Sequence, residues 1–389
     1  MNHRERLIAA LSHQQPDKIP IDVGGTVDSS IVVEGYAKLK EHFGIEAEDS
    51  LCNRMMRVVK VDENILQALD IDTRGVFMGA PIKGADQELE PDGYRDLWGI
   101  ERIKPPQSYY YDLRNSPLSG AISLDDIRKY PWPDPDDPGI LQGLKERVAW
   151  IRENTDCAAV LALPAPFIHV SQYLRGFEDW YCDIALNAKV FDALCDAVLE
   201  VSLEICKNVL KEVGQQVDVA LAGDDIGAQQ ALQISPEAYA KYIKPRHAKY
   251  FRQVHDLSPA KLVYHTCGSV VSIMQDLIEI AVDAIHPVQV SAAGMDPAGL
   301  KKNYGDRIAF WGGVDTQQIL PRGSVEDVKR TVEQCIEDMG AGGGYVLAAV
   351  HNIQPDVPLE NILAMFEHAR EYVPSFEKKE GVRSTLLTD

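Results

Sequence analysis

His265 and Cys267 lie two positions apart in the segment 263–268 (VYHTCG). Alternate side chains of a β-strand point to the same face, so the imidazole and the thiol would lie side by side. Neutral imidazole and thiolate are ligands that zinc prefers, and Gly268 would let the chain turn away after them. The pair predicts a zinc site. A buried cysteine beside a hydrogen-bonded histidine is an alternative that local spacing leaves open.

His351 follows another apolar run and is the candidate third ligand. Three protein ligands and one open position describe a catalytic zinc site. One thiolate and two neutral imidazoles would leave the ion with a net charge of about +1, which is more electrophilic than a centre with two thiolates. Such an ion could bind an anionic substrate group or lower the pKa of a bound water or alcohol. Alternatively, His351 contacts the substrate and no metal.

Other polar residues follow apolar runs in the same way. Asp224 and Asp225 are adjacent, so their side chains would point to opposite faces of a strand. We favour Asp225 as the catalytic residue and a substrate contact, acting as orienter, base or partner of a metal ligand. A helix cap or a solvated pair is the alternative. The remaining candidate substrate-binding residues are Asp22, Gln289, Asp315 and Asn352.

The elements that would position these residues alternate along the chain. Short apolar runs rich in β-branched residues are separated by amphipathic helices, which predicts a parallel α/β protein and, with eight strands, a closed (β/α)8 TIM-type barrel. Function in such barrels gathers where the strands end. The expected strands are Lys18–Val23, Arg74–Met78, Ala158–Leu163, Val217–Ala222, Lys261–His265, Ala284–Val288, Ile308–Trp311 and Tyr345–Ala349.

Cap signals mark several of the expected helices. Asn2, with Glu5 three residues later, predicts a capping box for an N-terminal helix. Ser235, followed by Pro236, predicts the start of another helix. The clearest helices are expected at Asp192–Val213 and Ser324–Met339.

The segment from about residue 80 to about 150 breaks this rhythm with many prolines and aromatic residues. We interpret the chain as one barrel domain spanning 1–389 with an insertion after the second strand. The insertion would begin with a hairpin around Pro91-Asp92-Gly93 and continue as a mobile stretch. It would serve either as a lid over the barrel or as a structural cover.

Composition excludes several classes of partner. The 389 residues carry a formal net charge of −20, which disfavours nucleic acids and anionic membranes. We expect a cytoplasmic protein because no run has the length of a signal peptide or a membrane span. The seven cysteines are odd in number and widely spread, so they predict no disulfide framework.

The strand ends resemble those of the uroporphyrinogen decarboxylase superfamily, and the resemblance spans nearly the whole chain. The matching segments are 175–178 (RGFE), 223–225 (GDD), 265–270 (HTCGSV), 286–289 (HPVQ), 295–297 (MDP), 310–317 (FWGGVDTQ) and 351–358 (HNIQPDVP). The resemblance implies a (β/α)8 barrel. It also implies one of two kinds of activity.

The decarboxylase branch of this superfamily carries an arginine-rich segment after the first strand and a catalytic aspartate after the second. Here 22–28 (DVGGTVD) has no arginine and 75–81 (GVFMGAP) has no aspartate. A site without arginines is poorly built for a porphyrinogen with many carboxylates. The resemblance therefore favours the other branch, the zinc methyltransferases that work with a corrinoid protein.

In that branch the zinc motif is His-x-Cys plus a distant cysteine, which His351 replaces here. This departure argues against a thiol as the methyl acceptor, but it does not argue against a bound metal. The expected function is a zinc-dependent methyltransferase acting between a small methyl donor or acceptor and a corrinoid (cobalamin) protein. The alternatives are a decarboxylase of a porphyrinogen or small acid, and a non-catalytic ligand-binding barrel. Whether two copies form a homodimer stays open.

Overall fold

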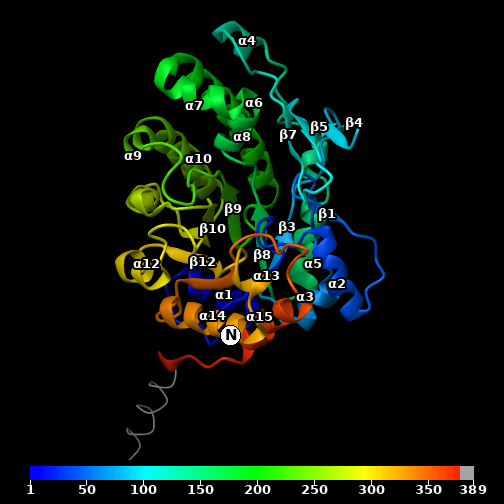
Figure 1. Ribbon diagram of the computed structural model, residues 1–389, viewed down its shortest axis with the longest axis vertical. Coiled ribbons are helices and arrows are strands. Elements are labelled where there is room, and N and C mark those ends of the chain that lie inside the picture. The colour runs from blue at the N-terminus through cyan, green and yellow to red at the C-terminus, as the bar shows by residue number, and fades with distance from the viewer. Residues whose placement is uncertain (377–389) are drawn as a thin grey trace, which may run out of the picture.

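The computed structural model describes residues 1–376 and is built around seven parallel strands (Figure 1). Neighbouring strands in the sheet follow one another in chain order, and helices connect them, as in a (β/α) barrel. The strands are β3 (Thr73–Val76), β8 (Ala158–Ala162), β9 (Val219–Gly223), β10 (Lys261–His265), β11 (Ala284–Val288), β12 (Ala309–Val314) and β13 (Tyr345–Ala349).

The eighth position of the barrel is filled by the segment around Ile21. Ile21 forms a parallel bridge with Leu347 of β13, and the N–H of Leu347 donates to the carbonyl of Pro20. On the other side, the N–H of Ile21 donates to the carboxylate of Asp72 at 2.7 Å. The prediction of a regular strand at 18–23 is therefore wrong, because a side chain replaces part of the backbone ladder. The predicted closed barrel is confirmed.

The other predicted strands are present, three of them with the predicted bounds: Lys261–His265, Ala284–Val288 and Tyr345–Ala349. The largest difference is in β12, which continues to Val314. Gly312 and Gly313 adopt φ values of 108° and 102° inside this strand. The strand therefore runs three residues beyond the predicted end at Trp311.

Helices surround the strands, and some of them begin at side-chain caps. Ser235 caps α9, which confirms the predicted cap, and Ser324 caps α14 with a capping box from Asp327. The α-helices after the N-terminal one are α2 (Val33–Phe43), α3 (Glu63–Ala68), α4 (Leu124–Lys129), α5 (Leu144–Asn154), α6 (Ile168–Arg175), α7 (Phe177–Leu186), α8 (Ala188–Val213), α9 (Pro236–Ala238), α10 (Lys244–Leu257), α11 (Met274–Glu279), α12 (Pro297–Tyr304), α13 (Ile319–Arg322), α14 (Val325–Met339) and α15 (Leu359–Glu371). Shorter turns of helix are η1 (Pro138–Leu141), η2 (Tyr239–Ile243) and η3 (Val271–Ile273).

The N-terminal helix α1 (His3–Leu11) closes one end of the barrel. Its predicted capping box between Asn2 and Glu5 is confirmed. Leu7 and Leu11 are buried in one apolar cluster with inward-facing residues of β8 to β13, such as Val263. Because apolar side chains fill this end, the interior of the barrel opens only toward the opposite end.

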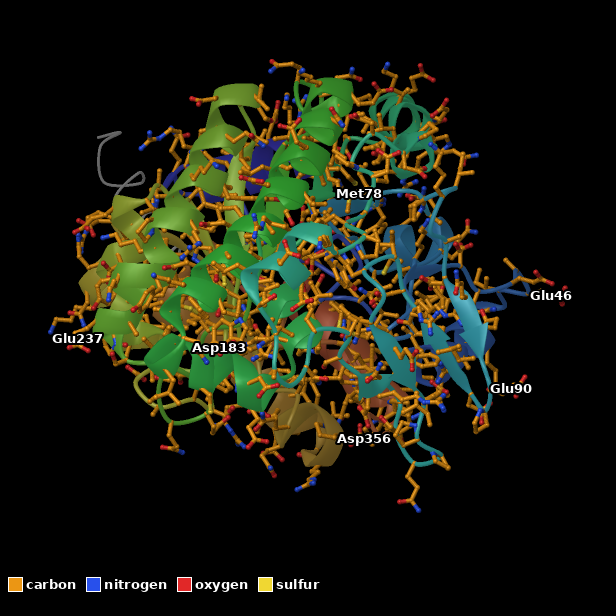
Figure 2. The ribbon with its side chains drawn as sticks, turned by 90° about the horizontal axis from the view of Figure 1, so that it is seen from above. Glu46, Met78, Glu90, Asp183, Glu237 and Asp356 are labelled. Carbon is orange, nitrogen blue, oxygen red and sulfur yellow. The ribbon has the colours of Figure 1, made fainter. Side chains whose placement is uncertain are left out.

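The predicted insertion lies between β3 and α5 and contains a four-stranded antiparallel sheet. Leu89 pairs with Gly93, which confirms the predicted hairpin. Figure 1 shows this sheet standing above β3 and β8, and Figure 2 places Glu90 of its outer hairpin at the edge opposite Glu237. The strands are β4 (Gln87–Leu89), β5 (Gly93–Arg95), β6 (Glu101–Ile103) and β7 (Asp112–Asn115), and a smaller ribbon is formed by β1 (Leu51–Asn53) and β2 (Val58–Val59).

Among residues 1–376, no helix combines the length and the apolar character that a membrane crossing would require.

Candidate active site

The structure brings His265, Cys267 and His351 together at the ends of β10 and β13. The Cys267 sulfur lies 3.6 Å from Nε2 of His265. One donor atom from each of the three side chains lies within 4.8 Å of the others. A single cation could therefore contact all three.

A layer of polar side chains inside the barrel supports His265 from behind. His265 Nδ1 lies 2.7 Å from Nδ1 of His286 on β11, so one of these nitrogens donates to the other. Burial lowers the pKa of His286 well below its usual range, which keeps that ring neutral. This hydrogen bond fixes the orientation of His265 and leaves its Nε2 toward Cys267.

The candidate Asp22 belongs to the same interior layer. It is fully buried, and its carboxylate accepts hydrogen bonds from the Trp311 indole at 3.1 Å and from the Thr73 hydroxyl. Burial raises the pKa of Asp22. Its carboxylate is taken up by protein partners, and Asp22 is not one of the three clustered residues.

Asp28, which sequence reasoning missed, lies beside the cluster. Its Oδ2 is 3.4 Å from Nδ1 of His265 and its Oδ1 is 4.0 Å from Nε2 of His351. The candidate Asn352 holds this loop in place, because its amide donates to the carbonyls of Val27 and Asp28 at 2.7 and 2.9 Å. The sequence did contain a signal for Asp28, because an acidic residue in the loop after the first strand would lie at the same end of the barrel as the other candidates.

The two acids after β9 have different surroundings. Asp224 is fully buried and accepts hydrogen bonds from the backbone N–H groups of residues 167–169 at the start of α6. Asp225 turns to the cluster, where its Oδ1 accepts from the backbone N–H of Cys267 at 2.7 Å and lies 3.6 Å from Nε2 of His265. Only Asp225 of the pair could thus contact a bound substrate or support a ligand.

Gln289 and Asp315 support loops. Gln289 accepts from the N–H of Gly268 at 2.7 Å and so holds the chain that follows Cys267. The Asp315 carboxylate accepts from the backbone N–H groups of residues 317–319 ahead of α13. Both side chains are largely buried, at 8% and 7% exposure, and their observed partners are protein groups.

A cavity of about 590 Å³ opens above the cluster. Its size falls in the range of small-molecule sites, and it counts against a non-catalytic barrel with a sealed mouth. His265, His351 and Asp225 line its floor, while aromatic and sulfur-containing side chains from the insertion and from the ribbon line its walls. Tyr110 of the insertion and Tyr173 of α6 are among the lining residues.

The donor set fits zinc. Burial lowers the pKa of His351, so its ring is a neutral imidazole with a free lone pair at neutral pH. Burial, with the charges of Asp225 and Asp28, raises the pKa of the Cys267 thiol well above its usual range. A thiolate is stable there only with a cation beside it. Imidazole and thiolate are both ligands that zinc prefers, and three protein ligands with one open position are typical of a catalytic site.

Residues 116–372 match the uroporphyrinogen decarboxylase (URO-D) family. The chain belongs to this family. The methylcobamide:CoM methyltransferase MtaA of Methanosarcina barkeri is 28% identical over 381 residues, which cover 95% of this chain and 98% of that protein. The uroporphyrinogen decarboxylase of Methylococcus capsulatus is 30% identical, but over 22% of this chain and 27% of that one.

A solved methyltransferase from Methanosarcina mazei has the same fold, with a TM-score of 0.66 and 19% identity, and covers 95% of this chain and 99% of that one. Within the URO-D family, the full-length similarity is thus to methyltransferases, as the sequence resemblance indicated.

The arginines of the cavity test the decarboxylase alternative within this family. Arg54 and Arg102 line it, and both are already paired with carboxylates. Arg54 bonds Asp86 and Glu88 at 3.2 and 2.8 Å, and Arg102 lies 3.3 Å from Asp96. Neither guanidinium is free to bind several carboxylates of a substrate, which counts against a porphyrinogen.

His169, at the start of α6, was also missed by sequence reasoning. Its Nε2 lies 3.4 Å from Oδ2 of Asp225. Burial opposes a charged ring, but the hydrogen bond and charge of Asp225, with the charges of Asp224 and Asp28, raise the pKa of His169 to about 9. The same pairing holds the pKa of Asp225 well below its usual range, although burial acts against it.

This ion pair predicts a specific pH dependence. Since the pKa of His169 is raised on folding, its stabilising effect is complete below the ordinary histidine pKa and is lost as pH rises through about 9. Histidine NMR should therefore show one resonance titrating near pH 9, absent in His169→Gln. Asp225→Asn should lower that pKa by at least about one unit. A titration at the ordinary pKa in the unsubstituted protein would show that no such pair forms.

Proposed function

We propose that this protein is a zinc-dependent methyltransferase that moves a methyl group between a small methylated substrate or acceptor and a corrinoid protein. The observation that carries this proposal is the cluster of His265, Cys267 and His351, of which the two histidines line an open cavity. The full-length similarity to the MtaA methyltransferase supports it. The paired arginines make a porphyrinogen a poor substrate.

We propose the following roles for the residues. His265, Cys267 and His351 hold the metal, which when bound supplies Lewis acidity to the heteroatom that carries the methyl group. His286 orients His265 through their Nδ1 atoms. Asp225 accepts from the backbone N–H of Cys267 with one oxygen and pairs with His169 through the other, and both side chains line the cavity that would hold the substrate.

The third ligand indicates whether this protein removes methyl groups from a donor or adds them to an acceptor. The resemblance implies a second cysteine where this chain has His351. One thiolate and two neutral imidazoles leave more positive charge on the ion than two thiolates do. That charge favours polarising an oxygen or nitrogen of a methyl donor over activating a thiol acceptor, so we propose that this chain removes methyl groups.

The experiment is a metal analysis combined with a transfer assay. The purified protein should contain about one zinc per chain, located by anomalous scattering beside His265 and Cys267. It should also consume cob(I)alamin, supplied as the free cofactor, in the presence of a methyl donor. Absence of zinc, together with activity that a chelator leaves unchanged, would rule out the proposed function.

We propose further that the insertion acts as a lid over the cavity. Tyr110, from the insertion, donates to the Asn352 side chain at 3.0 Å and accepts from the Gln354 amide at 2.7 Å. These bonds join the insertion to the loop after β13, which also carries His351. Closure of the lid would therefore act on the loop that carries His351.

Tyr110→Phe tests the lid, because it removes only the hydroxyl. Losing these bonds should cost about 1 kcal/mol and raise the KM for the methyl donor about fivefold, with little change in kcat. Hydrogen exchange of residues 105–115 should become faster. Tyr109→Phe is the matched control, since Tyr109 is 42% exposed. Unchanged KM and exchange in Tyr110→Phe would show that these bonds do not hold a lid.

A further inference from the structure

The cavity above the metal cluster has a polar floor and largely apolar walls. His265, His351 and Asp225 form the floor. The walls come from other segments, namely the ribbon β1–β2, the loop after β3, the insertion and α6. Their apolar side chains in the cavity include Met55, Met56, Met78, Leu97, Trp98 and Val170. A molecule bound with its methyl group toward the floor would therefore place the rest of its structure, its body, against apolar side chains.

Three of these wall residues are methionines. Met55 and Met56 lie in the turn of the ribbon, and Met78 lies two residues after β3. All three are partly exposed at the cavity. The unbranched methionine side chain adapts to the shape of its neighbour, and its sulfur makes favourable contacts with aromatic rings. This part of the wall is therefore suited to an apolar body, and a flat ring in particular.

The charged side chains of the walls pair with one another. Arg54 lies 3.2 Å from Asp86 and Arg102 lies 3.3 Å from Asp96, and all four line the cavity. The Arg102 guanidinium also lies over the ring of Tyr173, 4.4 Å from its centroid. A charged body would lose its hydration here without gaining an unpaired opposite charge, so the walls favour an uncharged one.

We infer that the methyl donor has an uncharged, apolar body about the size of an aromatic ring, and that Met78 helps to select it. This inference rests on the proposed function and concerns the body of the donor, whichever heteroatom carries the methyl group. The cavity of about 590 Å³ has the size of a small-molecule site. A one-carbon donor such as methanol would contact the floor and leave the apolar walls in contact with water, so their burial would contribute nothing to binding.

A binding experiment tests the charge of the body without turnover. The probes are anisole, 4-methoxybenzoate and (4-methoxyphenyl)trimethylammonium, which share one methoxy group and one ring and differ in charge. In calorimetric titrations of the full chain, anisole should bind at least ~10-fold more tightly than either charged probe. Its binding should show a negative heat-capacity change, which marks the burial of apolar surface. Equal affinities, or tighter binding of a charged probe, would overturn the inference.

Met78→Lys tests the wall itself, because it adds one unpaired cation to it. The variant should bind anisole at least ~5-fold more weakly and 4-methoxybenzoate ~10-fold more tightly than the unsubstituted protein. A loss of folding would weaken both ligands and could not produce this reversal. Met78→Leu keeps the volume and should change each affinity by less than ~2-fold. Leu186→Lys is the matched control, since Leu186 is 77% exposed on α7. An unchanged preference in Met78→Lys would show that Met78 does not select the body.

A rate experiment tests the size of the body. Two pairs of donors share the atom that carries the methyl group and differ in the body: methanol with anisole, and dimethyl sulfide with thioanisole. In whichever pair methylates cob(I)alamin, the ring-bearing donor should have a KM at least ~10-fold lower. The comparison uses KM because the leaving groups differ in reactivity. A compact donor with an equal or lower KM would overturn the inference.

The inference and the proposed function fail in different ways. If compact donors methylate cob(I)alamin with a KM no higher than that of ring-bearing donors, the proposed function stands and the inference about the body is wrong. If zinc is absent and no donor reacts, the proposed function is wrong. Preferential binding of anisole would then still identify the cavity as a site for an uncharged aromatic molecule.

Discussion

Cys267→Ser is expected to lose zinc and activity together. The Cys267 sulfur is the one thiolate donor in the cluster, 3.6 Å from Nε2 of His265. Serine has nearly the same size but is a far weaker ligand for zinc. Loss of a group that merely supports a ligand costs ~10- to 100-fold in metal affinity or activity, so loss of a ligand should cost at least that. Zinc per chain should fall from about one to below about 0.1.

The measurement is metal content after dialysis, followed by methyl transfer to cob(I)alamin. Cys182→Ser is the matched control, because Cys182 is an exposed free thiol on α7. It should keep both zinc and activity. If Cys267→Ser keeps its zinc and its rate, the metal lies elsewhere and the proposed mechanism is wrong.

Asp72→Ala is expected to produce the largest loss of stability among these variants. The Asp72 carboxylate is fully buried and accepts from the N–H of Ile21, from Arg6 and from Arg370, each at 2.7 Å. It therefore joins the closing segment of the barrel to α1 and α15. Removing one partner of a buried ion pair costs about 3–5 kcal/mol. Arg6 keeps Asp17 at 2.8 Å, so we expect about 3 kcal/mol here.

Urea denaturation of both proteins measures this change. Asp72→Asn should lose less, because an amide oxygen can still accept from the Ile21 N–H. Asp306→Ala is the control: its carboxylate is 81% exposed, so its free energy of unfolding should change by less than about 0.5 kcal/mol. A change below about 1 kcal/mol in Asp72→Ala would show that the barrel closes without this carboxylate.

The parts of the fold that could be predicted from sequence are those with a local cause. The strand Lys261–His265 is a short apolar run before a glycine, and its alternation places His265 and Cys267 on one face. The caps at Asn2, Ser235 and Ser324 depend on residues three positions apart. Such signals need no knowledge of the rest of the chain.

The parts that could not be predicted depend on distant segments meeting. Asp28 lies beside His265 in a loop that Asn352, more than three hundred residues later, holds by hydrogen bonds. His169 meets Asp225 across two loops of the barrel. The strands of the insertion are three or four residues long, too short for a period of two to stand out.

The helix that fills the amino end of the barrel also determines the order in which substrates bind and products leave. Because Leu7 and Leu11 pack there, a small molecule and a macromolecular partner must both approach the site from the opposite end of the barrel. A cavity of about 590 Å³ admits the former but is too small for the latter. If the proposed function holds, the methyl donor must bind before the corrinoid protein docks. The demethylated product can then dissociate only after the corrinoid protein has left.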